Sequence, residues 1–145
     1  MLTRRDFLAK GCMACVGVGL LTLSGCATHY AAGTIESSGL SILKSEFAQV
    51  KKGKTSYRTF LLIQNDKLEF PIYLYRFSET EYSALWMECT HQGAELQASG
   101  DFLYCPSHGS EFNNRGTVSN GPAEKNLRTL PFNLSGDKIV IDLRA

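Results

Sequence analysis

Two short segments combine cysteine with histidine: C-T-H at residues 89–91 and C-P-S-H at residues 105–108, with 13 residues between them in a chain of 145. Each segment supplies one thiolate and one imidazole, which suit zinc or an iron–sulfur cluster. All four side chains could surround one tetrahedral zinc ion. Alternatively, the thiolates could hold one iron of a two-iron cluster while the imidazoles hold the other. The candidate ligands are Cys89, His91, Cys105 and His108.

Glycines beside the two histidines distinguish these arrangements. Gly93 and Gly109 follow the histidines closely, where glycine lets the backbone take positive φ and approach a ligand. Backbone N–H groups in such loops can point at an anionic acceptor. Bridging sulfides are acceptors of this kind and a single zinc ion has none, so the glycines favour the two-iron cluster.

The two segments together resemble the Rieske [2Fe–2S] proteins, through C-T-H-x-G followed by C-P-x-H-G-S. The similarity continues through 111–113, Gly116, Leu127 and the stretch 120–123, which matches the proline loop that covers the cluster in that family. The resemblance is specific over roughly 80–145 and rests on general β character over 41–79.

The resemblance implies a role for each candidate ligand and for one serine. By that resemblance, Cys89 and Cys105 bind the inner iron of a Rieske-type [2Fe–2S] cluster. His91 and His108 correspondingly bind the outer iron. The hydroxyl of Ser110 is expected to donate a hydrogen bond to a bridging sulfide.

Three positions differ from the high-potential Rieske proteins of quinol-oxidising cytochrome complexes. Where those proteins have a second cysteine pair forming a disulfide, this chain has Ala94 and Ser107. Where they place a tyrosine hydroxyl near a cluster cysteine, this chain has Phe112. Hydrogen bonds to the sulfurs stabilise the reduced state, so losing one lowers the midpoint potential. We expect a potential in the lower or middle part of the family's range of ~−150 to +300 mV.

Residues 1–25 have the layout of a cleavable export signal. Arg4-Arg5 precede an apolar run from Gly11 to Leu23 that is too short and glycine-rich for a membrane span. The stretch 3–8, T-R-R-D-F-L, resembles the twin-arginine signal, whose machinery exports folded proteins with their cofactors installed.

The end of this leader, L-S-G-C at 23–26, resembles the lipobox of bacterial lipoproteins. In those proteins the cysteine, here Cys26, carries a diacylglycerol, and two acyl chains suffice for stable anchoring. An uncleaved N-terminal helix is the alternative anchor. Cys12 and Cys15 mimic a C-x-x-C redox pair but stand within the apolar leader, where they are expected to act as small hydrophobes. The exported domain then keeps two cysteines, each close to a histidine, which indicates a metal site rather than a disulfide.

The chain beyond the leader is predicted to be all-β. Residues 26–40 are predicted to be the lipidated cysteine and a flexible tether, in which His29 is solvated, and 41–145 to be the Rieske domain. Apolar and aromatic patterning predicts strands and no helix in this part. The expected strands are 41–50, 57–64, 69–77, 82–88, 102–104, 127–134 and 138–143. With the family resemblance, they predict a small antiparallel β-sandwich or barrel with a cluster-binding subdomain.

These features predict a one-electron carrier, lipid-anchored outside the cytoplasm, that is a subunit or partner of a respiratory or other membrane-associated redox system. Its partner could be a quinol-oxidising cytochrome complex or a periplasmic oxidoreductase. The net charge of +1 gives no reason to expect a nucleic acid partner. No catalytic residues, mononuclear iron site or substrate domain were recognised. The alternative is a lipoprotein whose zinc site serves structure or sensing.

Overall fold

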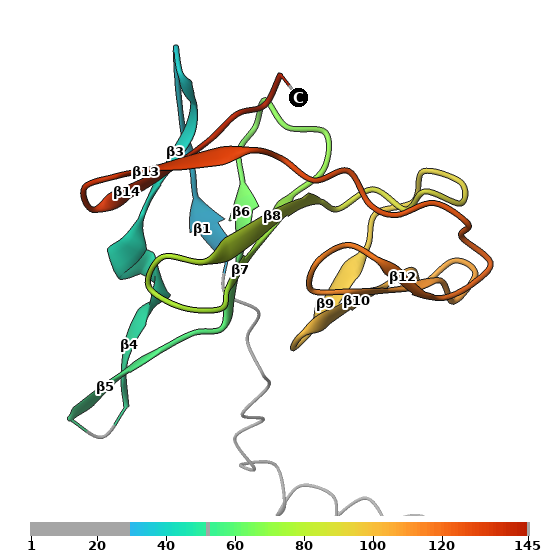
Figure 1. The fold of residues 1–145 in the computed structure, drawn as a ribbon, viewed down its shortest axis with the longest axis horizontal. Coiled ribbons are helices and arrows are strands. Elements are labelled where there is room, and N and C mark those ends of the chain that lie inside the picture. Colours follow the sequence, from blue (N-terminus) through green and yellow to red (C-terminus); the bar gives the residue numbers. More distant parts are fainter. Residues whose placement is uncertain (1–29, 52, 145) are drawn as a thin grey trace, which may run out of the picture.

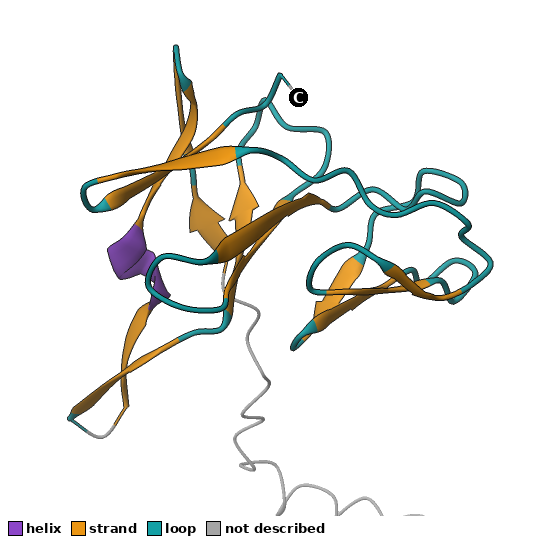
Figure 2. Ribbon diagram, viewed as in Figure 1, coloured by secondary structure: helices purple, strands orange, loops and turns teal. Residues whose placement is uncertain are grey.

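The computed structural model describes residues 30–51 and 53–144, and these residues form an all-β domain (Figure 1). Within them the only helical element is a 3-10 turn, η1 (Lys44–Phe47), and strands and loops make up the rest (Figure 2). The prediction of an all-β fold is confirmed. In the described part of the chain no helix is long and apolar enough to cross a membrane.

Fourteen strands form four sheets, counting the described residues only. The central sheet has the order β1-β6-β7-β8 and consists of β1 (Tyr30–Ala32), β6 (Phe60–Gln64), β7 (Ile72–Arg76) and β8 (Tyr82–Trp86). The second sheet, β13-β14-β3-β2, consists of β13 (Phe132–Ser135), β14 (Lys138–Ile141), β3 (Gly39–Leu43) and β2 (Thr34–Glu36). The third sheet, β12-β11-β10-β9, consists of β12 (Val118–Asn120), β11 (Glu111–Asn113), β10 (Phe102–Tyr104) and β9 (Gln97–Ser99). A separate hairpin pairs β4 (Ala48–Lys51) with β5 (Lys54–Tyr57).

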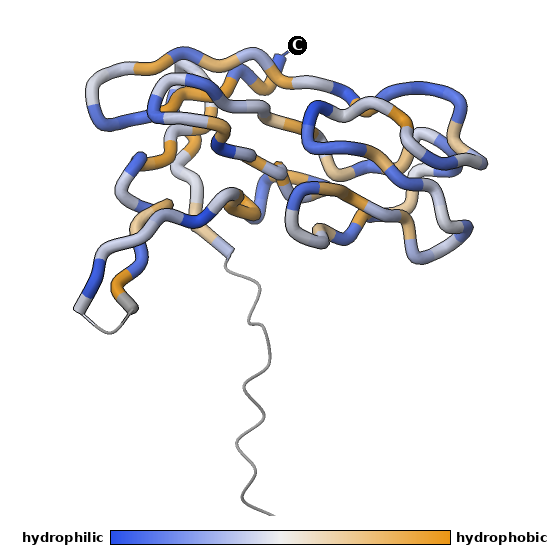
Figure 3. The backbone as a smooth tube through the Cα atoms, turned by 60° about the horizontal axis from the view of Figure 1, so that its bottom comes forward, coloured by the Kyte–Doolittle hydropathy of each residue, from blue (hydrophilic) through white to orange (hydrophobic). Residues whose placement is uncertain are grey.

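The central sheet is buried on both faces, which explains its nearly continuous apolar strands. One face packs against the second sheet in a core that includes Leu61, Ile63, Ile72, Leu74 and Ala84. The alternate residues of the same strands, Leu62, Tyr73 and Leu85, belong to another core, which they share with the third sheet. The hydropathy colouring shows these apolar stretches running through the body of the domain (Figure 3). The central sheet therefore joins the base of the domain to the subdomain formed by the third sheet.

The predicted tether is wrong for residues 30–40, which form β1, β2 and the start of β3. β1 pairs in parallel with β6, and β2 pairs with β3 in a hairpin. Ala31 and Leu40 are almost completely buried. β1 has one buried residue and β2 has none, so neither has enough hydrophobic pattern to be recognised from the sequence. Residues 1–29, including the predicted signal, Cys26 and His29, lie outside the described residues.

Several predicted strands are shorter or divided. The segment 41–50 is interrupted by η1, because Phe47 turns inward and is completely buried. The segment 57–64 is divided at Arg58-Thr59, between β5 and β6. In the predicted strand 127–134, only Phe132–Leu134 is extended within β13, while Leu127 and Leu130 reach the cores from irregular chain.

Replacing Tyr73 by phenylalanine should weaken the junction between the central sheet and the third sheet. The buried Tyr73 hydroxyl donates a 2.8 Å hydrogen bond to the carbonyl of Gly100 in the β9–β10 turn, and burial raises the pKa of this hydroxyl. Loss of one such bond should lower the free energy of unfolding by about 1 kcal/mol. Chemical denaturation measures the change. Tyr104→Phe, which removes an exposed hydroxyl bonded to Gln97, is the control and should have a smaller effect.

Candidate metal centre

The two cysteine–histidine segments form two loops with the same backbone hydrogen bonding. In the first, which follows β8, the carbonyl of Cys89 accepts from the N–H of Gly93 at 2.8 Å, and the N–H of Cys89 donates to the carbonyl of Ala94 at 2.8 Å. In the second, between β10 and β11, the corresponding bonds join Cys105 to Gly109 at 3.0 Å and to Ser110 at 2.8 Å. Each cysteine thus begins a closed loop of equal length.

Glycine is required at the same place in both loops. Gly93 has φ 73° and Gly109 has φ 79°, in the left-handed region that disfavours residues with a Cβ. Each of these glycines donates the hydrogen bond that closes its loop. The expectation of positive φ at these two positions is confirmed.

The loops bring all four candidate ligands together at one end of the subdomain. The Cys89 and Cys105 side chains interact with each other, both residues are 2% exposed, and neither forms a disulfide. The rings of His91 and His108 are perpendicular with centroids 5.0 Å apart. His91 is partly buried and His108 is exposed. The thiols therefore lie on the inner side of the site and the imidazoles on the outer side.

Backbone N–H groups on the inner side of the site stabilise the thiolate forms of the two cysteines. Burial raises the pKa of the Cys89 thiol, partly opposed by the backbone N–H groups of His91 and Gln92. For Cys105 burial acts in the same direction, but backbone N–H groups of Ser107 and His108, together with the Cys89 side chain, lower its pKa overall. Amide N–H groups directed at sulfur stabilise thiolate, which is the form that binds iron.

One imidazole of the donor set has a nitrogen that is free to bind a metal. Among the described residues, His91 Nδ1 is the only buried side-chain nitrogen or oxygen without a hydrogen-bond partner, and a nitrogen of this kind can offer its lone pair to a metal. A structural zinc ion needs four ligands around one centre. A two-iron cluster needs only two protein ligands at each iron.

Ser110 lies between the second loop and the segment predicted to cover the cluster. It is completely buried, and its Oγ accepts a 3.0 Å hydrogen bond from the N–H of Ala123. This leaves the hydroxyl proton to be donated elsewhere. The Gly121–Pro122 peptide bond immediately before Ala123 is cis.

A second bond ties the same covering segment to the first loop. The Thr90 hydroxyl donates to the carbonyl of Lys125 at 2.6 Å. No pattern in the sequence predicted this role for Thr90, and the available signal was its place between Cys89 and His91. The segment 121–125 is therefore held to both loops.

Apolar side chains form the floor beneath the two thiols. Phe112, which is completely buried, belongs to the same core as Cys89 and Cys105. The other fully buried members of this floor are Tyr73, Leu85, Met87, Leu96 and Leu103. The floor excludes water from the inner side of the site, so charges there interact more strongly than at the surface.

A comparison with protein families decides the identity of this arrangement. The model of the Rieske [2Fe–2S] domain matches residues 43–131. The chain belongs to the Rieske [2Fe–2S] domain family. The cofactor of this Rieske domain is accordingly a Rieske-type [2Fe–2S] cluster.

Similar proteins agree with this assignment. The chain is 38% identical over 69 residues to the mitochondrial Rieske subunits of the cytochrome b-c1 complex from Chlorocebus aethiops and Gallus gallus, covering 46% of this chain and 25% of each subunit. It therefore spans about a quarter of the length of these curated relatives. Among solved structures, the cyanobacterial plasma membrane Rieske protein PetC3 from Synechocystis PCC 6803 is 29% identical with a TM-score of 0.50. That match covers 58% of this chain and 86% of the other.

Phe112→Tyr should raise the midpoint potential of this Rieske domain. A hydroxyl added in the buried floor can donate to a ligand sulfur and favour the reduced, more negative state. A net bond worth ~1 kcal/mol more in the reduced state corresponds to a rise of roughly 40 mV for one electron. Redox titration measures the shift. Phe102→Tyr, at an exposed position on β10, is the control and should leave the potential unchanged.

Proposed function

We propose that this Rieske domain is a one-electron carrier in which Cys89 and Cys105 hold the inner iron, while His91 and His108 hold the outer iron. The observation that carries the proposal is the sidedness of the site: the thiols are buried on an apolar floor, and outside them lie the partly buried His91 ring and the exposed His108 ring. The bound cluster supplies the chemistry by taking up and releasing a single electron. Exposed His108 is then the shortest route between the cluster and a docked partner.

The residues around the cluster bind and insulate it rather than transform a substrate. The loop N–H groups and the Ser110 hydroxyl stabilise charge on sulfur, because an oriented dipole in a water-poor site costs no reorganisation. The covering segment is held by hydrogen bonds to Ser110 and Thr90, and it would limit the access of water to a cluster bound by the two loops. We assign no residue to proton transfer or to bond breaking.

The similar proteins support a membrane-associated redox partner. The curated relatives are Rieske subunits of the cytochrome b-c1 complex, and the similar solved structure is a plasma membrane Rieske protein. A quinol-oxidising cytochrome complex or a periplasmic oxidoreductase is the partner class that fits. Phe112 and the positions Ala94 and Ser107 favour a carrier of lower potential than the disulfide-containing Rieske subunits.

The N-terminal sequence supports a location on the outer side of the cytoplasmic membrane. We propose that 1–25 is a twin-arginine signal and that Cys26 carries the lipid. Three residues, 27–29, stand between Cys26 and the first described strand, which begins at Tyr30. Export of a folded protein agrees with a cluster that is inserted in the cytoplasm.

Spectroscopy of the purified holoprotein tests the electron-transfer proposal. Two iron and two sulfide per chain are expected, with a reduced-state EPR signal of the low average g value typical of Rieske centres. The reduced protein should pass electrons to an oxidised cytochrome c in stopped-flow measurements. A colourless protein that contains one zinc ion would contradict the proposal and support the structural or sensing alternative.

Changing Arg4-Arg5 to Lys-Lys should strongly reduce export of the holoprotein, because the proposed machinery reads the arginine pair. We expect at least a tenfold loss of cluster-containing protein from the membrane fraction, with accumulation in the cytoplasm. Cell fractionation and immunoblotting measure the distribution. Cys26→Ser is the matched comparison, since it should leave export intact but release the domain from the membrane. Unchanged export of the Lys-Lys variant would contradict the signal assignment.

A further inference from the structure

The β4–β5 hairpin projects from the body of the domain and exposes apolar side chains. In Figures 1 and 3 it extends away from the sheets, and Figure 3 shows hydrophobic colour on it. Val50 is 72% exposed and Tyr57 is 54% exposed, the largest exposures among the large hydrophobic side chains of the described residues. A two-stranded ribbon of this kind is marginal in water unless another surface covers it.

The two faces of the hairpin differ in chemistry. The register pairs Ala48 with Tyr57 and Val50 with Thr55, so these four side chains share one face. The other face carries exposed Lys54 and the half-buried Gln49 and Ser56. A face that exposes valine and tyrosine, with a lysine on the opposite face of the same ribbon, suits the boundary between acyl chains and headgroups, where long basic side chains reach toward phosphate.

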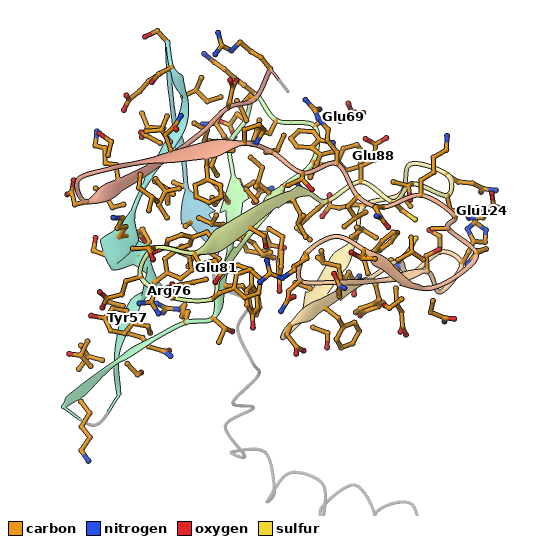
Figure 4. All side chains as sticks on the ribbon, in the orientation of Figure 1. Tyr57, Glu69, Arg76, Glu81, Glu88 and Glu124 are labelled. Carbon is orange, nitrogen blue, oxygen red and sulfur yellow. The ribbon has the colours of Figure 1, made fainter. Side chains whose placement is uncertain are left out.

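The hairpin is held in position relative to the body. The Arg58 N–H donates to the carbonyl of Phe47 at 2.7 Å, and Arg58 Nη1 donates to the carbonyls of Glu46 and Ala48 at 3.2 and 2.8 Å. The Arg76 guanidinium stacks on the Tyr57 ring at 4.8 Å from its centroid, and Figure 4 shows the two side chains side by side. These contacts fix the orientation of the hairpin, and with it the face that carries Val50 and Tyr57, relative to η1 and β7.

The hairpin and the entry of the chain into the fold lie at the same end of the central sheet. Tyr30 pairs with Leu62 in a parallel ladder, so the chain enters from the end where β6 begins, just after Tyr57. β8 leaves the opposite end of this sheet, at Trp86, and continues into the first ligand loop. In Figure 4, Tyr57 and Arg76 lie far from Glu124, which belongs to the segment covering the site. A lipid on Cys26 is at most about 14 Å of chain from Tyr30, so the membrane must lie at the hairpin's end of the sheet.

We infer that the β4–β5 hairpin is a second membrane contact, which lays Val50 and Tyr57 into the headgroup layer and places Lys54 against anionic phospholipid. This inference rests on the lipid anchor proposed above for Cys26. The contact fixes the orientation of the domain, so that the ligand loops leave the end of the central sheet that faces away from the bilayer. A partner that receives electrons from His108 then meets the domain above the membrane surface.

The test uses mature, oxidised, lipidated holoprotein in vesicles of phosphatidylcholine, with or without 30% phosphatidylglycerol. An environment-sensitive fluorophore is placed by Val50→Cys on the hairpin or by Asp66→Cys in the β6–β7 turn, at the opposite end of the sheet. We expect the label at position 50 to be at least twofold brighter than the label at position 66, and brighter with phosphatidylglycerol than without it. Mass spectrometry of the same samples reports whether Cys26 carries its lipid.

Charge reversal at the two ends of the sheet provides matched variants. Each lysine near an anionic surface strengthens contact about fivefold, so Lys54→Glu should reduce the ratio of contacting to free hairpin at least fivefold. Lys67→Glu makes the same charge change in the β6–β7 turn and should have no effect. Two results with lipidated Cys26 would contradict the membrane contact: equal responses of both labels, or a response at position 50 only to an added redox protein. Neither result would contradict the proposed lipid anchor. If Cys26 carries no lipid, the proposed anchor fails and the inference fails with it.

Discussion

His108→Ala should remove the Rieske cluster from this protein, with a loss of more than about nine-tenths of its iron and sulfide, because one iron would keep a single protein ligand. His108 is exposed and belongs to neither buried core, so its truncation leaves no cavity in either. We therefore expect the β domain to remain folded while the visible absorption and the reduced-state EPR signal disappear. Iron and sulfide analysis with far-UV circular dichroism measures both properties.

Gln92→Ala is the matched control for this substitution. Gln92 is an equally exposed residue of the first loop, and its contribution to the site is the backbone N–H directed at Cys89, which alanine retains. Its cluster content and EPR signal should equal those of the wild type. Full cluster occupancy in His108→Ala would contradict the assignment of His108 to the outer iron. If Gln92→Ala lost the cluster as well, the loss would report loop stability rather than ligation.

Ser110→Ala should lower the midpoint potential of the cluster and destabilise the domain at the same time. The Ser110 hydroxyl accepts from the N–H of Ala123, which leaves its proton for a bridging sulfide. A charge-assisted bond worth ~1–2 kcal/mol more in the reduced state corresponds to a fall of roughly 40–90 mV in the one-electron potential. The same change leaves the N–H of buried Ala123 without its partner, which should cost about 1–3 kcal/mol of unfolding free energy.

Redox titration and chemical denaturation separate the two effects of Ser110→Ala. Ser119→Ala, at an exposed position on β12, is the control and should change neither quantity. An unchanged potential with reduced stability would show that Ser110 serves only the covering segment. The double variant with Phe112→Tyr should recover part of the lost potential, because the two substitutions act on sulfur in opposite directions.

The sequence alone was sufficient to predict the all-β class and to propose a donor set, whose four residues the fold brings together. Cys89, His91, Cys105 and His108 occupy short segments, where local spacing and ligand chemistry are enough to indicate a metal centre. The positive φ of Gly93 and Gly109 could also be predicted, because it is a local requirement of a tight loop. The structure has positive φ at both positions. The predicted strand 102–104 matches β10, and the predicted strand 138–143 is observed over Lys138–Ile141; both predictions succeeded because each strand lies beside a recognisable turn.

Tertiary structure decided which short segments belong to the domain. β1 depends on a parallel ladder with β6, about thirty residues away, and Leu40 depends on a core built from the second sheet and the central sheet. Neither the strand nor its burial leaves a local pattern in the sequence, so 30–40 was mistaken for a tether. The bonds from Ser110 to Ala123 and from Thr90 to Lys125 likewise join segments whose meeting depends on the whole fold.

The chemical character of the site was therefore determined by the sequence, since ligand identity and loop closure act over a few residues. The sidedness of the site was decided by folding, which places the thiols over the floor that includes Phe112 and leaves His108 in water. The β4–β5 hairpin and its exposure were also decided by folding, because the predicted strands 41–50 and 57–64 include most of β4 but only the last residue of β5. Burial depends on which distant segments pack together, and only the assembled sheets determine that.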